Sequence, residues 1–109
     1  MGLAEKNCVP CRGRIPPLGT SAAAEFLKQL DNWEVAEGRH LTKTFTFPDF
    51  KTALGFVNRI GTMAEEQNHH PDIYLAWSKV RVDVWTHKIN GLTESDFVFA
   101  AKCDVLFTA

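Results

Sequence analysis

Alternating apolar and polar residues predict a β-hairpin between residues 72 and 85. Every second residue is apolar on either side of Ser78-Lys79, which is the two-residue period of strands with one buried face. We expect Ser78-Lys79 to form the turn, although it lacks the Asn-Gly chemistry that hairpin turns favour. The resulting apolar pairs are Ile73 with Val84, Leu75 with Val82, and Trp77 with Val80. The same register places His70 opposite His87.

Helical periods and turn residues predict the other elements. In chain order we expect a helix over 20–30, a strand over 32–35, a turn at Glu37-Gly38, a strand over 40–47, a helix over 49–67, the hairpin, and a helix from about residue 93. The capping-box pattern Thr93-Glu94-Ser95-Asp96 marks the start of the last helix. The residues expected to face the core are Ala23, Phe26, Leu27 and Leu30 in the first helix, Phe50, Ala53, Leu54, Val57, Ile60 and Ala64 in the second, and Phe97, Ala100, Ala101 and Val105 in the third.

This order of elements, α-β-β-α-β-β-α, predicts an α+β fold. The natural arrangement is a four-stranded antiparallel sheet with helices on one face. With 109 residues, of which 45% are hydrophobic, the chain suits one globular domain. We place that domain at residues 20–109, after a Pro-, Gly- and Cys-containing arm over residues 1–19.

Composition excludes several classes of function. The formal net charge is −1, which argues against direct nucleic-acid binding, because such binding depends on neutralising phosphates. No apolar run approaches the roughly 18 residues that span a bilayer, and the N-terminus lacks the apolar segment of a secretory signal. We therefore expect a cytoplasmic protein without membrane contacts.

The chain contains three cysteines, an odd number that suits a reducing compartment better than a disulfide scaffold. Cys8 and Cys11 have the spacing of a redox pair or of half a zinc site. A structural zinc site normally needs four ligands, and the sequence has no second Cys-x-x-Cys. An arm without chemistry is the favoured interpretation, and the role of these cysteines stays open.

The candidate chemistry lies between residues 65 and 96. Three of the four histidines fall in this segment, namely His69, His70 and His87, together with the carboxylates Glu65 and Asp96. Because the ordinary pKa of histidine is about 6.5, it can donate and accept protons near neutrality. The cluster therefore indicates acid–base chemistry or metal ligation.

These residues resemble the signature of the pterin-4a-carbinolamine dehydratase family. The matching features are Glu65-x₃-His69-His70-Pro71, Trp77, His87 and Asp96, with Phe45-x-Phe47, Val80 to Val84, Thr86-His87, Gly91-Leu92-Thr93-x-x-Asp96, the arm Cys8-Val9-Pro10-Cys11-Arg12-Gly13, and Pro16-Pro17-Leu18. The resemblance covers nearly the whole chain. The fold of the family has the same α-β-β-α-β-β-α order.

The resemblance implies a hydro-lyase that dehydrates 4a-hydroxytetrahydropterin, the carbinolamine released by aromatic amino acid hydroxylases. The product is the quinonoid dihydropterin, which is reduced in tetrahydrobiopterin recycling. No electron moves in this step, so neither a cofactor nor a metal is expected, and the pterin is the substrate. Functional coupling to a hydroxylase and a homodimer or homotetramer are implied as well.

The resemblance also assigns roles to single residues. His69, His70 and His87 are the catalytic histidines; we expect His69 and His87 to transfer protons and His70 mainly to position the pterin. Glu65 would orient an imidazole or contact the pterin, and Asp96 would hydrogen-bond His87 or the ligand. The remaining assignment is Pro71, which disfavours helix at His70 and so marks the turn into the strand.

Two positions depart from many relatives. Trp85 replaces a smaller residue and could line or narrow the pocket, or pack against a neighbouring subunit. Ser95 stands where relatives often carry a basic residue. His40 lies outside the motif, and we expect it at the surface.

Alternatives remain for both the protein and its residues. Animal members of the family also act as dimerisation cofactors of a homeodomain transcription factor, so the chain could be an interaction module without enzymatic activity. A metal site from His70, His87 and a carboxylate is a second rival, although the adjacent His69 and His70 would point to opposite faces of a strand. Without the resemblance, Glu65 reads as a solvated helix end and Asp96 as a helix cap.

Overall fold

The computed structural model describes residues 2–9 and 16–108. Its elements are η1 (Leu3–Glu5), α1 (Thr20–Leu27), β1 (Glu34–Ala36), β2 (His40–Thr46), α2 (Phe50–Gln67), β3 (Asp72–Ala76), β4 (Lys79–Val84), η2 (His87–Ile89) and α3 (Glu94–Thr108). Here η denotes a 3₁₀ turn.

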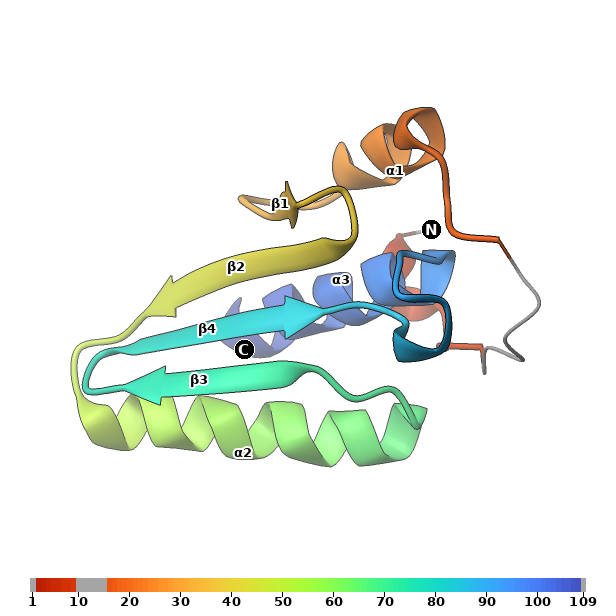
Figure 1. Cartoon of the computed structure of the whole chain (residues 1–109). Coiled ribbons are helices and arrows are strands. Elements are labelled where there is room, and N and C mark those ends of the chain that lie inside the picture. The colour runs from red at the N-terminus through yellow and green to blue at the C-terminus, as the bar shows by residue number, and fades with distance from the viewer. Residues whose placement is uncertain (1, 10–15, 109) are drawn as a thin grey trace.

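The four strands form one antiparallel sheet in the order β1-β2-β4-β3. Figure 1 shows α3 behind the sheet and α2 running alongside β3. The other broad face of the sheet has no helix over it in this view. The predicted α+β class and element order are confirmed. None of the helices in the described ranges has the length and apolar character needed to span a membrane.

The hairpin register differs from the prediction by two residues. Ile73 pairs with Val82 rather than Val84, and the turn is Trp77-Ser78. Trp77 is 69% exposed, and the carbonyl of Ser78 accepts a hydrogen bond from the Phe47 amide at 2.8 Å. That bond continues the β2–β4 ladder into the turn. A shift of two residues keeps the strand side chains on their faces, so Ile73 and Leu75 stay on the apolar side, whereas Trp77 leaves it for the turn.

The buried face of α2 was only partly predicted. Asp49 caps the helix by accepting a hydrogen bond from the Thr52 amide at 2.8 Å, and hydrogen bonding from Thr52 holds the pKa of Asp49 below its usual range. Phe50 and Leu54 are exposed, contrary to expectation. The buried residues are Ala53, Phe56, Ile60, Met63 and Ala64. Phe56 and Met63 were not predicted, so the buried face of the helix is rotated away from Phe50 and Leu54 relative to the predicted stripe.

The core extends beyond the predicted helical and strand residues. Leu3, from the arm, is only 4% exposed and belongs to the same buried cluster as the sheet. In α3 every residue from Ser95 to Ala101 is buried, because the sheet, η1, α1 and α2 surround its first turns. Val105, in contrast, is exposed, so the predicted face of α3 fails at its last position.

Gly91 provides a test of this packing. A Cβ atom at Gly91 would lie 2.8 Å from the Cβ of Pro17, whereas a Cβ at Gly61 in α2 meets nothing within 4 Å. We expect Gly91→Ala to lower the free energy of unfolding by roughly 1–3 kcal/mol through overpacking. Gly61→Ala should raise it by up to about 1 kcal/mol, because alanine is the better helix former. Urea denaturation of both variants measures this; equal stability would contradict the close approach of Pro17 to Gly91.

Candidate active site

Two of the predicted histidines directly follow the end of α2. Asn68 adopts the left-handed conformation with φ 51° and ψ 43°. The amide of His69 donates to the Ala64 carbonyl at 3.1 Å, and that of Asn68 to the Glu65 carbonyl at 3.4 Å. This pair of bonds is the Schellman motif that ends many helices. It turns the chain sharply, so that His69 and His70 follow the helix directly.

His69 forms the central contact of the site. Its Nε2 lies 2.6 Å from Oδ1 of Asp96, and its side chain is only 12% exposed. A carboxylate oxygen only accepts, so Nε2 is the donor and, in the neutral ring, Nδ1 is left with the free lone pair. The ring also packs against Phe99 of α3, with centroids 5.8 Å apart. His69 is therefore fixed in both position and tautomer.

Asp96 is fully buried and accepts three hydrogen bonds. Besides His69, the donors to Oδ2 are the Thr86 hydroxyl at 2.8 Å and the Thr93 amide at 2.9 Å. The contact with Thr93 is the capping interaction expected at the start of α3. Asp96 thus serves both as a cap and as a histidine partner. Its histidine partner is His69, not the predicted His87.

Thr86 was not singled out from the sequence as a site residue. It continues the inward-facing series of Val80, Val82 and Val84 and is only 5% exposed. The sequence did contain a signal for Thr86. Its hydroxyl falls at an inward-facing position of the alternating pattern, and a buried polar group needs a hydrogen-bond partner. Its backbone amide and carbonyl also bond Gly91, at 2.9 and 3.4 Å. These bonds close the η2 loop that presents His87.

His70 and Glu65 form a second, more exposed pair. Nε2 of His70 lies 2.5 Å from Oε2 of Glu65, with 52% and 77% of their side chains exposed. Glu65 therefore contacts an imidazole, that of His70, and its role toward the pterin stays a prediction. Pro71 follows in extended backbone before β3 begins.

The predicted opposition of His70 and His87 is wrong. Neither residue lies in a strand, because β3 begins at Asp72 and β4 ends at Val84. Instead, His87 packs edge-to-face on Trp85, with ring centroids 4.4 Å apart. The segment of His69 and His70 is connected to the η2 loop through Asp96, which is hydrogen-bonded to both His69 and Thr86.

His40, which we expected at the surface and outside the motif, is half-buried and stacks on Trp85. The ring centroids are 3.9 Å apart and the planes differ by 19°. Trp85 thus lies between His40 and His87.

The N-terminal arm contacts a residue next to this site, Ser95. The Ser95 hydroxyl accepts from the Val9 amide at 2.7 Å and donates to the Val9 carbonyl at 3.2 Å, while the amide of Cys8 donates to Gln67 Oε1 at 2.8 Å. Ser95 and Gln67 precede Asp96 and Asn68, respectively. The arm therefore connects α3 to the end of α2.

Of the predicted Cys8–Cys11 pair, Cys11 lies outside the described residues. Burial raises the pKa of the Cys8 thiol to about 11. At neutral pH Cys8 is therefore a protonated thiol, which is neither a good nucleophile nor a good metal ligand. Among residues 2–9 and 16–108, no group of three or more His, Cys, Asp or Glu is arranged to hold a metal ion.

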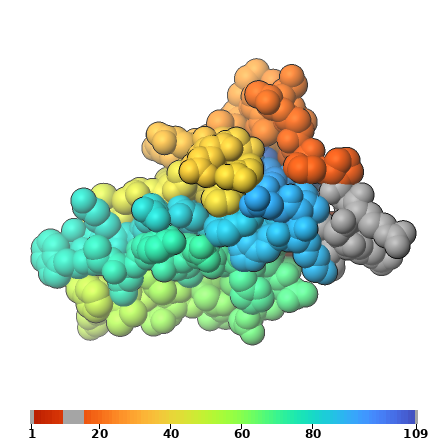
Figure 2. Space-filling view, in the orientation of Figure 1, coloured from red at the N-terminus to blue at the C-terminus, as the bar shows by residue number. Residues whose placement is uncertain are grey.

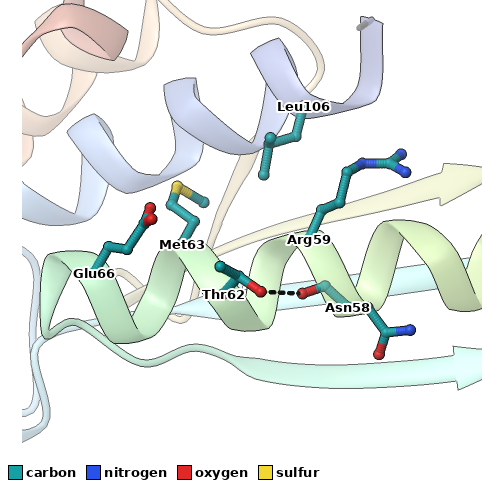
Figure 3. A pocket seen from close by; sticks show the side chains of 6 residues that line it. All are labelled: Asn58, Arg59, Thr62, Met63, Glu66 and Leu106. Carbon is teal, nitrogen blue, oxygen red and sulfur yellow. Dashed lines mark hydrogen bonds between the residues drawn. The ribbon is translucent and has the colours of Figure 1, made fainter.

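A separate groove of about 380 Å³ lies between α2 and α3 (Figure 3). Its lining residues are Asn58, Arg59, Thr62, Met63, Glu66 and Leu106. None of them is a predicted site residue. We therefore take the histidine cluster, and not this groove, as the candidate site.

The bonds to Asp96 predict a specific effect of Thr86. We expect Thr86→Val to cost roughly 1–3 kcal/mol of stability, because a buried carboxylate loses one donor. Thr86→Ser keeps the hydroxyl and should restore most of the loss. Urea denaturation measures stability, and long-range ¹H–¹⁵N NMR of the imidazoles reports the tautomer and environment of His69.

Thr42→Val is the matched control, because it removes another Thr–Asp bond, to Asp83 at 2.5 Å, on the same sheet. The His69 signals should shift in Thr86→Val and remain in place in Thr42→Val. Identical histidine spectra in both variants would contradict the role of Thr86 in holding Asp96.

Comparisons with a family model and with known sequences point to the same family. The family described as pterin 4 alpha carbinolamine dehydratase matches residues 16–106. A protein of Rubrobacter xylanophilus, provisionally assigned as a pterin-4-alpha-carbinolamine dehydratase, is 57% identical over 104 residues, covering 95% of this chain and 97% of the relative. A protein of Alkaliphilus metalliredigens with the same assignment is 50% identical over 103 residues, covering 94% and 93%.

Solved structures agree with this comparison. The crystal structure of a transcriptional coactivator/pterin dehydratase from Brucella melitensis is 38% identical with a TM-score of 0.78, covering 83% of this chain and 97% of that one. A pterin dehydratase-like protein identified as a RuBisCO assembly factor in the alpha-carboxysome is 22% identical with a TM-score of 0.62, covering 72% and 93%; that likeness shows the fold alone. With the family match over most of its length and relatives at 50% identity or more, this chain belongs to the pterin 4 alpha carbinolamine dehydratase family.

Proposed function

We propose that this protein dehydrates 4a-hydroxytetrahydropterin by histidine acid–base catalysis. Family membership supports the reaction class, a hydro-lyase acting on a pterin carbinolamine. The observation that carries the histidine mechanism is the buried pair of His69 and Asp96, at 2.6 Å. A carboxylate behind an imidazole fixes the ring nitrogen that remains for chemistry.

The reaction requires two proton transfers and no change of oxidation state. The C4a–O bond breaks, and the hydroxyl leaves as water after accepting a proton. The C4a=N5 bond forms, and N5 loses its proton. An acid at the hydroxyl and a base at N5 therefore suffice, each contributing typically 10²–10⁴-fold. No cofactor or metal is needed for this balance.

The geometry favours His69 as the base. Its Nε2–H is held by Asp96, so Nδ1 of the neutral ring can accept the N5 proton. His87, on the exposed η2 loop, is the acid that protonates the leaving hydroxyl and can be reprotonated by solvent. His70, held by Glu65, positions the pterin, and Pro71 supports its place in the turn.

The physiological setting is part of the same proposal. The carbinolamine arises from pterin-dependent hydroxylation of aromatic amino acids, and the quinonoid product requires reduction, so the protein would act in tetrahydrobiopterin recycling. A homodimer or homotetramer in the cytoplasm is the expected form.

An interaction module is the alternative function. The Brucella protein is described both as a transcriptional coactivator and as a pterin dehydratase. A scaffold has no need for a buried carboxylate aligned on a histidine, so the site favours the enzyme. Dehydration no faster than the uncatalysed reaction would reverse this ranking.

The direct test follows the decay of carbinolamine generated by a hydroxylase, with and without the protein. We expect acceleration, and a loss of kcat of about 10²–10⁴-fold in His69→Ala and His87→Ala. His70→Ala should act mainly on KM. Trp77→Ala, in the exposed turn at the other end of the hairpin, is the control and should remain near wild type. If His70→Ala abolishes kcat while His69→Ala leaves it intact, the roles must be exchanged.

Asp96→Asn separates orientation from capping. The single side-chain oxygen of the asparagine can keep the hydrogen bonds from Thr86 and Thr93. Its amide NH₂ group then faces His69. Nε2 of His69 must then accept, so the proton moves to Nδ1 and the ring can no longer act as the base there. We expect kcat/KM to fall tenfold or more, with stability within roughly 1–2 kcal/mol of wild type. Full activity in this variant would leave Asp96 as a cap alone.

A further inference from the structure

The stretch of the N-terminal arm before α1 packs on the η2 loop. The Leu18 amide donates to the Leu92 carbonyl at 2.8 Å, and Pro17 lies so close to Gly91 that a Cβ atom there would be 2.8 Å from the proline Cβ. Figure 2 shows the orange stretch before α1 against the blue segment that follows β4. Because Gly91 also bonds Thr86 to close the loop, this part of the arm supports the loop.

The first residues of the arm are anchored on α3. Leu3 is buried in the core, and η1 contacts α3 (Figure 1). The Ala4 carbonyl accepts a hydrogen bond from Nζ of Lys102 at 2.8 Å, and Lys6 is paired with Glu94 at 2.5 Å. The arm therefore has fixed contacts on the helix before it reaches the site.

Two consecutive residues of the arm, Cys8 and Val9, then connect the end of α2 to the start of α3. The Cys8 amide donates to Oε1 of Gln67 at 2.8 Å, and the Val9 backbone is bonded twice to the Ser95 hydroxyl, at 2.7 and 3.2 Å. Gln67 stands two positions before the site histidine, and Ser95 stands one position before the buried carboxylate. Because consecutive Cα atoms are only about 3.8 Å apart, this bridge leaves little freedom between the two helix ends.

We propose that the arm is a clamp that holds His69 and Asp96 at hydrogen-bonding distance, with Gln67 and Ser95 as its positioning residues. The histidine follows α2 and the carboxylate belongs to α3, so their 2.6 Å contact requires both helix ends to stay in place. A hydrogen bond is lost when its atoms separate by about 1 Å, and a misplacement of that size can cost about 100-fold in rate. The catalytic consequence rests on the proposed function, whereas the geometric consequence does not.

The exposure of the two partners makes the clamp separable from the fold. Ser95 is only 6% exposed, so its hydroxyl is committed to the arm, whereas Val9 is 68% exposed. When the hydroxyl is removed, the backbone of Val9 can bond water instead, and little stability is lost. The core contacts of Leu3 are untouched by such a change.

The test compares the full-length variants Ser95→Ala, Gln67→Leu and their double variant with wild type. Hydrogen exchange of the Cys8 and Val9 amides reports release of the arm. Exchange of the Nε2–H proton of His69 with water reports its bond to the carboxylate, because this side chain is only 12% exposed. In the double variant we expect both exchange rates to rise about tenfold or more. The value of kcat should fall on the order of tenfold with KM little changed, as for a positioning contact.

Gln67→Glu keeps an acceptor for the Cys8 amide and should retain the clamp. Lys6→Ala, the control, removes an arm contact outside the bridge whose side chains are 53% and 46% exposed, and it should stay near wild type. Released amides with an unchanged His69 proton and unchanged kcat would overturn the clamp, as would amides that stay protected in the double variant. Failure of wild type to dehydrate the carbinolamine would overturn the proposed function instead, and the imidazole exchange would still decide the clamp.

Discussion

The buried carboxylate of Asp96 is the constraint on which the rest of the site depends. A carboxylate without solvent contact is costly unless each oxygen is hydrogen-bonded. Here the donors are His69, which follows α2, Thr86, which follows β4, and Thr93, which precedes α3. Satisfying one charge therefore brings together segments that are far apart in the sequence. Disturbing any of these donors should affect both the fold and the chemistry.

This arrangement restrains His69 and His87 to different extents. His69 is held by Asp96 and packed on Phe99, which suits a group whose proton must be at a defined nitrogen. His87 belongs to a short loop closed by the two backbone bonds between Thr86 and Gly91. One fixed and one accessible imidazole suit the proposed reaction, in which one proton is taken from the substrate and another is supplied from solvent.

Around this shared centre, the chain has features that a family match does not explain. Ser95 binds the arm at Val9, so this position stabilises the N-terminal segment. Trp85 stacks on His40. Both contacts lie beside the site without touching the pair of His69 and Asp96.

The sequence by itself determined the type and order of the elements, because apolar periods and caps act locally: the capping-box pattern before α3 and the alternation on either side of the hairpin turn predicted them correctly. It did not determine the register, since a shift of two residues leaves the same side chains on the apolar face. It indicated the histidines and carboxylates, but not that Asp96 would meet His69 or that His40 would meet Trp85. Those pairings join different elements, and only the packing of α2, β4 and α3 around one core decides which side chains lie within hydrogen-bonding distance.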